Sequence, residues 1–358
     1  MIKQLIAKVV RGENLTEDEM AAAMEEMMSG GATEAQIGAF MTALRLKGET
    51  VDEITGAART LRAKATKINI NNHAVNIDRD EINIEDETIL DIVGTGDGTR
   101  TFNVSTTTAF VAAGGGIKVA KHGNRAVSSL CGSADVLESL NVELDLTTSD
   151  VEKCINEIGI GFLYAPLFHG AMKYAAGPRR EIGIRTIFNL LGPLANPAGA
   201  SAQVLGVYEP ELTEKMAQVL KRLGTREAFV VCGEGTYDEI SICGPTRVSH
   251  LKDNDVRTFH MTPEEFGFQR ADCEDIVGGN ARENADITRS IFNGDKGPKR
   301  DMVLLNASAA FVASGLCDNF SDGLEIAADS IDSGKARQKL DNLIEFTRQC
   351  TPYIRKVL

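Results

Sequence analysis

The sequence contains no tryptophan, and aromatic residues make up only 5% of its 358 positions. Proteins that bind single-stranded nucleic acid stack bases on aromatic side chains, so this scarcity argues against such a platform. Basic residues are also few, since 38 Lys and Arg face 51 Asp and Glu and the formal net charge is -13. Nucleic acids and anionic membranes attract positively charged proteins, so neither is the expected partner. A small anionic ligand in one basic pocket stays compatible.

Paired cysteine motifs and long apolar runs are missing as well. The cysteines lie at positions 131, 154, 232, 243, 273, 317 and 350 and form no C-x-x-C. Their odd number and their scatter indicate neither a disulfide framework nor a zinc site, so we expect a reducing cytoplasmic location. No stretch reaches membrane-spanning length, and the first twenty residues lack a sustained apolar run. We therefore expect a soluble protein without a targeting segment.

Helix signals dominate the first part of the chain. Capping boxes begin at Thr16 ("TEDE"), Thr33 ("TEAQ") and Thr50 ("TVDE"), and each opens an apolar-periodic segment. Residues 1–70 are therefore predicted to form a small helical domain. The polar stretch "NINNHAVNIDRDEINIEDE" that follows is interpreted as a linker.

After this stretch, short apolar runs such as "TILDIVGTG" and "EAFVVCGEG" alternate with helix-like segments. This alternation predicts a larger α/β domain with a mainly parallel sheet flanked by helices. The helical spacing in "LFHGAMKYAAGPRREIGIRTIFNLLGPLANP" indicates that about residues 166–190 complete the helical domain. The α/β domain would then comprise residues 71–165 and 191–358.

The stretch "DIVGTGDGTRTFNVSTTTAF" runs from a strand through a glycine-rich turn into a helix opened by Asn103 or Ser105. Such a turn aims backbone N–H groups and a helix N-terminus at phosphate oxygens, although a plain tight turn before a capped helix is the alternative. Thr99 occupies the place of the last glycine of a Rossmann fingerprint, and no Gly-Lys-Ser/Thr of a P-loop follows.

A second basic loop, "KHGNRAVSS", follows the predicted strand "IKVA". Ligands of open α/β sheets bind at the carboxyl ends of strands, so both loops are expected to face one crevice. Lys121 offers a point charge, Arg125 a planar fork, and Ser128 and Ser129 hydroxyl groups, a set that suits a diphosphate. A solvated turn is the alternative interpretation of this loop taken alone.

Acidic and basic side chains elsewhere complete the candidate site. Asp238 and Glu239 follow another predicted strand, where they could bind the Mg²⁺ that accompanies a diphosphate, although most such pairs are solvated surface. Arg179, in "GPRREIG", is either a surface charge or a bidentate partner for a carboxylate. His169 is singled out only as a residue at a predicted helix start.

Several long motifs together resemble the anthranilate phosphoribosyltransferase family, which has a nucleoside phosphorylase-like fold. They are "FNVST", "KVAKHGNRAVSS", "CGSADVLE", "GIRTIFNLLGPLANP" and the Asp238-Glu239 pair, and the similarity runs nearly end to end. The resemblance implies transfer of the phosphoribosyl group of 5-phosphoribosyl 1-diphosphate to the amino group of anthranilate, in tryptophan biosynthesis. It also implies a Mg²⁺ cofactor and a homodimer formed through the amino-terminal helices.

The same resemblance implies roles for individual residues. Lys121, His122 and Arg125 would be catalytic, with His122 lining the approach of the amine. Gly94, Asn124 and Arg179 would contact anthranilate, a second molecule of which could bind near His169, and Ser105, Asp238 and Glu239 would contact Mg²⁺. The residues implied to bind phosphoribosyl diphosphate are Gly94, Asp97, Gly98, Thr101, Asn103, Val104, Ser105, Thr106, Lys121, Gly123, Asn124, Arg125, Ser128, Ser129 and Ser133.

One motif departs from the family pattern. The first loop of the family usually contains G-T-G-G-D, whereas this chain has "GTGDG", one glycine fewer before Asp97. The shorter loop leaves open an altered acceptor or a noncatalytic relative of the same fold. A pyrimidine nucleoside phosphorylase is a weaker alternative, because its phosphate loop should contain Lys-His-Ser-Thr-Gly-Gly instead of "KHGNRAVSS".

Overall fold

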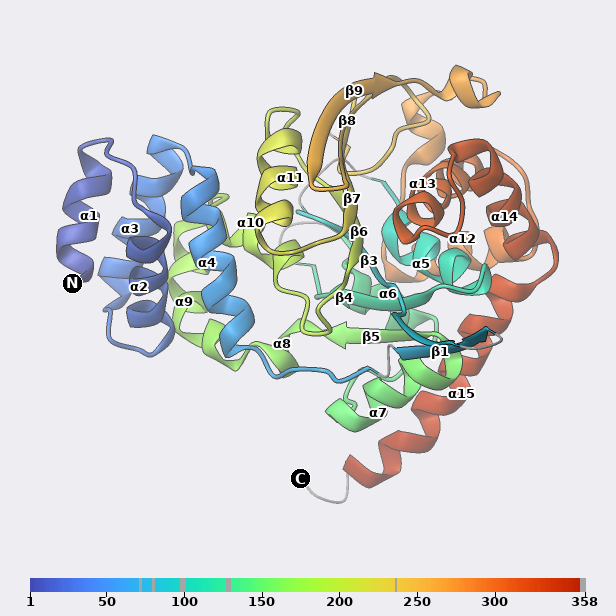
Figure 1. The fold of residues 1–358 in the computed structure, drawn as a ribbon, viewed down its shortest axis with the longest axis horizontal. Helices are drawn as coiled ribbons and strands as arrows, with labels where there is room; N and C mark the ends of the chain where they lie inside the picture. Colours follow the sequence, from blue (N-terminus) through green and yellow to red (C-terminus); the bar gives the residue numbers. More distant parts are fainter. Residues whose placement is uncertain (71–72, 79–80, 97–100, 127–129, 236, 355–358) are drawn as a thin grey trace.

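The chain builds a bundle of helices beside a seven-stranded sheet that helices cover (Figure 1). The computed structural model describes residues 1–70, 73–78, 81–96, 101–126, 130–235 and 237–354. The bundle begins with four helices, which are α1 (Ile2–Val10), α2 (Glu17–Met28), α3 (Glu34–Lys47) and α4 (Val51–Lys64).

The three predicted capping boxes open α2, α3 and α4. In each, a threonine hydroxyl accepts a hydrogen bond from the backbone N–H three residues later, and that residue's side chain accepts one from the threonine N–H. These reciprocal bonds satisfy amides that have no partner inside the helix, which fixes where each helix begins. The pairs are Thr16 with Glu19, Thr33 with Gln36, and Thr50 with Glu53.

A later segment returns to this bundle, as its helical spacing predicts. It forms α8 (Ala165–Phe168), α9 (Lys173–Ile182) and α10 (Ile187–Leu194). Helix α9 packs on α2 and α3, and α10 packs on α3 and α4. The division of the chain into two domains with the bounds given above stays a prediction.

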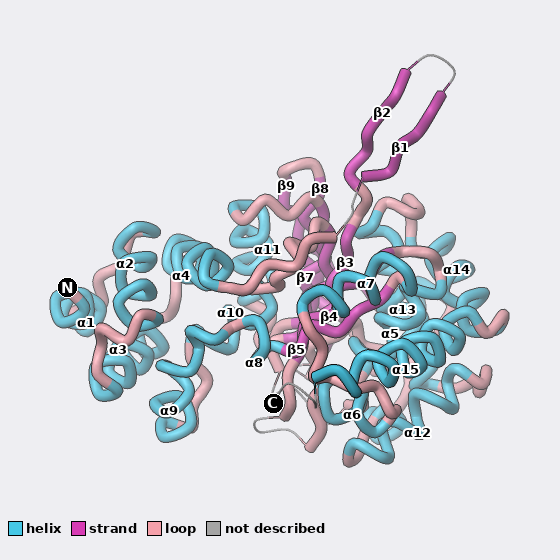
Figure 2. Tube along the Cα trace, turned by 90° about the horizontal axis from the view of Figure 1, so that it is seen from below, coloured by secondary structure: helices cyan, strands magenta, loops and turns pink. Residues whose placement is uncertain are grey.

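The linker interpretation of the polar stretch was wrong. The chain there forms two antiparallel strands, β1 (His73–Asp78) and β2 (Glu81–Asp86), which project from the body as a hairpin (Figure 2). The register pairs Val75 with Ile84 and Ile77 with Ile82. Apolar residues thus alternate with polar ones at the period of a strand, a signal that the polar composition obscured.

The main sheet has the order β5-β4-β3-β6-β7-β8-β9. Its first five strands pair in parallel and the last two pairings are antiparallel, so the prediction of a mainly parallel sheet is confirmed. The strands are β3 (Ile89–Gly94), β4 (Lys118–Gly123), β5 (Ile160–Tyr164), β6 (Ala202–Gly206), β7 (Glu227–Gly233), β8 (Thr246–Lys252) and β9 (Asp255–Met261).

Both faces of the sheet are buried, as expected for parallel strands. In β7, Phe229 and Val231 enter one hydrophobic core, whereas Val230 and Cys232 enter the other. The first core also contains α5 (Val104–Gly114) and α13 (Pro298–Ser314), and the second contains α11 (Leu212–Arg222) and continues into the helical bundle. The remaining α-helices are α6 (Ser133–Ser139), α7 (Thr148–Lys153), α12 (Ala281–Phe292), α14 (Phe320–Asp332) and α15 (Lys335–Ile354).

Strand β4 is longer than the sequence indicated. Lys121 and His122 were expected in a loop, but they pair with Phe162 and Leu163 of β5, and Gly123 ends the strand. The parallel partner extends the ladder beyond the apolar run on which the prediction relied. As a consequence, Lys121 and His122 are buried within the sheet.

No helix in the described ranges is both long and apolar enough to cross a membrane. All seven cysteines are free thiols.

Candidate active site

A cleft of about 790 Å³ lies where the sheet meets the helical bundle. The ends of β3 and β4, the start of α5 and the segment after β7 form one side, and α4, α9 and α10 contribute the other. The carboxyl ends of parallel strands are the expected place for a ligand site. Both predicted loops therefore reach the same cleft.

Most of the site residues predicted from the sequence line this cleft. Thr106 does not, because its side chain is buried within α5. Asp97, Gly98, Ser128 and Ser129 lie outside the described residues. Those in the lining are Gly94, Thr101, Asn103, Val104, Ser105, Lys121, His122, Gly123, Asn124, Arg125, Ser133, His169, Arg179, Asp238 and Glu239.

The start of α5 faces the cleft. The first N–H groups of any helix lack acceptors within the helix and carry partial positive charge. Asn103 occupies the N-cap position, yet in the described part of the chain its side chain caps none of these amides. The helix start is therefore open to an anion.

The carboxylate pair comes within hydrogen-bond distance of the glycine-rich turn. The backbone N–H of Gly96 donates to Asp238 Oδ2 at 3.1 Å, and Thr101 Oγ1 donates to Glu239 Oε1 at 3.3 Å. A Cβ on Gly94 would overlap the Asp238 carboxylate, and one on Gly206 would overlap its backbone. Glycine at both positions thus permits the pair to approach the turn.

Glu239 carries the clearest sign of a missing partner. Its side chain is 9% exposed, and its buried Oε2 has no hydrogen-bond partner among the described residues. Burial, reinforced by the charge of Asp238, raises the pKa of Glu239 well above its usual range. A cation bound by this oxygen would supply the missing partner and favour the ionised form.

The donor set fits Mg²⁺, which prefers hard oxygen ligands and keeps several waters. Asp238, Glu239 and Ser105 offer carboxylate and hydroxyl oxygens in the cleft lining. Within the described ranges, no group of three or more His, Cys, Asp or Glu forms a metal cluster. Mg²⁺ usually takes one or two carboxylates and keeps several waters, which Asp238 and Glu239 would match.

Lys121 lies beneath the cleft with its side chain 3% exposed. Its Nζ donates to the backbone carbonyl of Ile92 at 2.7 Å. Burial lowers the pKa of Lys121 to about 8, although the charges of Asp91 and Asp238 oppose this shift. Asp91, which is fully buried, has its own pKa raised by burial to about 6. Asp91 could not be predicted from the sequence, because nothing in "ILDIVG" indicates a charged partner.

Two buried histidines form a pair at the junction of the sheet and the bundle. His122 Nε2 and His169 Nε2 are 3.2 Å apart, and their rings meet edge to face. Burial is the main reason why the pKa falls to about 3 for His122 and about 4 for His169. Both imidazoles are therefore neutral at neutral pH.

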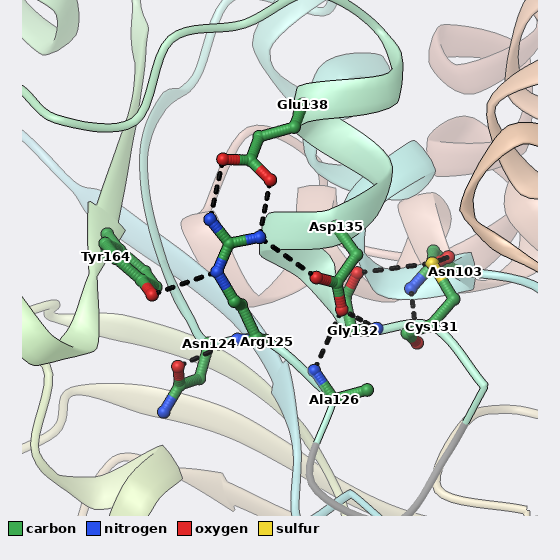
Figure 3. Close-up of polar contacts among 9 residues, drawn as sticks. All are labelled: Asn103, Asn124, Arg125, Ala126, Cys131, Gly132, Asp135, Glu138 and Tyr164. Carbon is green, nitrogen blue, oxygen red and sulfur yellow. Dashed lines mark hydrogen bonds and ion pairs between the residues drawn. The ribbon is translucent and has the colours of Figure 1, made fainter.

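The guanidinium of Arg125 is held by side chains of this protein (Figure 3). Its Nη2 donates to Glu138 Oε1 at 2.7 Å, its Nη1 to Asp135 at 3.2 Å, and its Nε to the Tyr164 hydroxyl at 3.2 Å. The predicted diphosphate contact of this fork would require release from these partners. Lys121, by contrast, is buried in the lining of the cleft at the end of β4.

An apolar wall faces the polar strand ends. Arg179 lies with its guanidinium carbon 5.2 Å from the centre of the Phe188 ring. Leu61, Met172 and Phe188 also line the cleft, and sequence analysis missed all three. The sequence around these three residues does not distinguish them from apolar residues in the core of a helical bundle. An aromatic ligand with a carboxylate would match a wall of this composition.

Comparisons with known proteins agree with this geometry. The chain matches two family models, described as the glycosyl transferase family a/b domain over residues 86–337 and its helical bundle domain over residues 3–65. It is 59% identical to the anthranilate phosphoribosyltransferase of Geobacter sulfurreducens over 350 residues, which cover 98% of this chain and 100% of the relative.

Solved structures are similar over the same extent. The anthranilate phosphoribosyltransferase of Thermus thermophilus superposes with a TM-score of 0.87 at 42% identity, covering 96% of this chain and 99% of that one. The enzyme of Saccharomyces cerevisiae in complex with phosphoribosyl diphosphate (PRPP) and Mg gives a TM-score of 0.85 at 29% identity, covering 97% and 98%.

The histidine pair predicts acid sensitivity. A histidine whose pKa is about 4 when folded binds fewer protons than in the unfolded chain, where the pKa is about 6.5. Its stabilising contribution is present above pH 6.5 and is lost as the pH falls toward 4. Between pH 7 and 5, the loss should be on the order of 2 kcal/mol for His169. Urea unfolding at both pH values measures it.

The variants His169→Gln and His260→Gln separate this effect from general acid sensitivity. His260 is exposed on β9 and serves as the matched control. His169→Gln should lose less stability than the wild type on acidification, whereas His260→Gln should match the wild type. If the free energy of unfolding depended on pH equally in all three proteins, the acid sensitivity could not be assigned to His169.

Proposed function

The chain belongs to the anthranilate phosphoribosyltransferase family, and we propose that its cleft binds 5-phosphoribosyl 1-diphosphate and anthranilate. The enzyme transfers the phosphoribosyl group to the amino group of anthranilate, releasing diphosphate. The arrangement of the cleft is the main support for this proposal. A buried cation, a carboxylate pair and an open helix start lie on one side of the cleft, and an apolar wall with an arginine lies on the other.

Phosphoribosyl diphosphate lies along the strand ends in this proposal. Its phosphate oxygens accept hydrogen bonds from the N–H groups at the start of α5, where the helix dipole also favours negative charge. Lys121 stabilises the charge that develops on the leaving diphosphate. Its low exposure strengthens the interaction, because little water screens it.

Asp238, Glu239 and Ser105 would hold Mg²⁺ in the cleft. When bound, the ion supplies Lewis acid stabilisation of the departing oxygens. The yeast relative was solved with PRPP and Mg, which supports the assignment of the cofactor. Gly94 and Gly206 support the metal site indirectly, because their lack of side chains lets the carboxylates approach the glycine-rich turn.

Anthranilate lies against the apolar wall. Arg179 binds its carboxylate, Asn124 orients it, and Phe188 contacts the ring. A related complex of the yeast enzyme contains 4-fluoroanthranilate, an aromatic amine of the same class. Gly94, at the end of β3, lies between the two substrates.

The chemical step is a substitution at the anomeric carbon. A bond forms between the anthranilate nitrogen and C1′ while the bond between C1′ and the diphosphate oxygen breaks, and the nitrogen loses one proton. His122 faces the cleft, but its pKa of about 3 makes it a weak proton acceptor. Orientation and electrostatic stabilisation therefore provide most of the acceleration.

The activity is tested by following the fluorescence of anthranilate after the purified protein, phosphoribosyl diphosphate and Mg²⁺ are combined. We expect the signal to fall only when all components are present, and EDTA to stop the reaction because it removes the cation. Heat-denatured protein is the control. Undiminished fluorescence with a folded protein would contradict the function.

Arg179→Ala tests the anthranilate site. Loss of a charge-assisted hydrogen bond costs about 1.5–3 kcal/mol, so the KM for anthranilate should rise about 10- to 100-fold. The KM for phosphoribosyl diphosphate should stay within about twofold, since Arg179 lies on the opposite wall. Arg180→Ala is the matched control, because Arg180 is its exposed neighbour and does not line the cleft. Equal effects of both variants would remove Arg179 from the site.

We also infer a homodimer formed through the amino-terminal helices, in a cytoplasmic enzyme. Exposed apolar side chains support it, since Leu46 of α3 is 84% exposed and Val10 of α1 is 68% exposed. Sedimentation should give about twice the 38.5 kDa chain mass, and Leu46→Asp should shift the protein toward monomer. A monomeric wild type would contradict the inference.

A further inference from the structure

The segment around residues 277–284 contacts the site but has no part in the function proposed above. Val277 forms a β-bridge with Thr101 of the first loop. Gly278 lies so close that a Cβ there would be 2.6 Å from the Phe102 Cα. The start of α12 is thereby held against the backbone that leads into α5.

Asn284 of α12 is the polar link between these segments. Its side chain is 2% exposed, its Oδ1 accepts a hydrogen bond from the Gly279 N–H at 2.7 Å, and its Nδ2 donates to Asn103 Oδ1 at 2.9 Å. Both ends of the amide are thus engaged, which fixes its orientation. A buried amide with this geometry specifies the position of its partners.

The Asn103 side chain is bound from its other side by Cys131, which lies between β4 and α6. Asn103 Nδ2 donates to the Cys131 carbonyl at 3.3 Å, and the Cys131 thiol donates to Asn103 Oδ1 at 3.2 Å (Figure 3). Asn103 therefore lies between Asn284 and Cys131. These hydrogen bonds direct the Asn103 side chain away from the start of α5.

This arrangement is unusual for an asparagine at an N-cap. Such a residue normally turns its oxygen onto the second or third N–H of the helix, which satisfies that donor. Asn103 makes no such bond within the described residues. Its oxygen is instead used by Asn284 and Cys131, which leaves the N–H groups of Ser105 and Thr106 available to a phosphate. The Val104 N–H donates to the Phe102 carbonyl at 2.7 Å.

We propose that Asn284 is a positioning residue for the phosphoribosyl diphosphate site: it holds the Asn103 side chain off the start of α5 and keeps the helix amides open. The role rests on the function proposed above. Asn284 acts through Asn103 and does not line the cleft.

Asn284→Asp tests the role with little change in volume. The aspartate still accepts from Gly279, but it places a second acceptor against Asn103 Oδ1 and frees that side chain to cap α5. Small displacements of positioning groups can cost about 100-fold, so kcat/KM for phosphoribosyl diphosphate should fall about 10- to 100-fold. The KM for anthranilate should change less than about twofold, because its wall is untouched.

Thr288→Val is the matched control on the same helix. Thr288 is 1% exposed, one turn after Asn284, and bonds the hydroxyl of Thr107, the fourth residue of α5, at 3.0 Å; among the residues that the structure describes, it makes no hydrogen bond to the Asn103 side chain. In this variant, kcat/KM for phosphoribosyl diphosphate and the KM for anthranilate should both stay within about threefold of the wild type. If Thr288→Val lost as much kcat/KM for phosphoribosyl diphosphate as Asn284→Asp, the proposal would be overturned. Such a result would show that the packing of α12, and not the Asn284 amide, determines the activity.

A double-mutant cycle tests whether Asn284 acts through Asn103. If it does, Asn103→Ala with Asn284→Asp should lose no more kcat/KM for phosphoribosyl diphosphate than Asn103→Ala alone. Additive losses would overturn the proposal. Should Asn284→Asp fail to fold, Asn284→Ser replaces it, with the same split between the two substrates expected.

Calorimetric titration of Mg²⁺-phosphoribosyl diphosphate without anthranilate separates this proposal from the proposed function. We expect the wild type to bind and Asn284→Asp to bind about 10-fold more weakly or worse. A wild type that binds but does not turn over would contradict the transferase function and still leave Asn284 testable. Equal affinity of the two proteins would overturn the role of Asn284.

Discussion

Burial of charge at the strand ends is the constraint on which the site depends. Lys121 and Glu239 are both less than 10% exposed, and burial pushes their pKa values in opposite directions, each toward the neutral form. A ligand that brings a cation to Glu239 and an anion to Lys121 favours the charged form of both groups. These buried groups make the cleft electrostatically complementary to a metal-bound anion, in a chain whose formal net charge is -13.

The sequence was sufficient where local chemistry decides the structure. The threonine hydroxyls at positions 16, 33 and 50 satisfy amides only three residues away, so the starts of α2, α3 and α4 follow from spacing alone. The same holds for Asp238 and Glu239, whose place after an apolar strand predicted their arrival at the sheet edge. The individual roles of these site residues stay predictions.

What the sequence could not predict depends on partners that are distant in the chain. Lys121 belongs to β4 because β5 pairs with it, and a basic residue gives no local sign of such burial. Asn103 and Asn284 are 181 residues apart, so their hydrogen bond has no counterpart in any local pattern. Arg125 was assigned to a ligand from its charge, while Glu138 of α6 holds it in the structure. In each case a tertiary contact decides where the side chain lies, and the diphosphate role of Arg125 stays a prediction.

The second hydrophobic core, which runs from one face of the sheet into the bundle, has a consequence for how the molecule melts. Val93 and Leu205 of the sheet share it with Phe188 and with Met24 and Leu44 of the bundle. Separating the two units would expose apolar surface on both, at a cost that grows with the area uncovered. Unfolding of the bundle alone would therefore also uncover apolar surface on the sheet, so each unit stabilises the other.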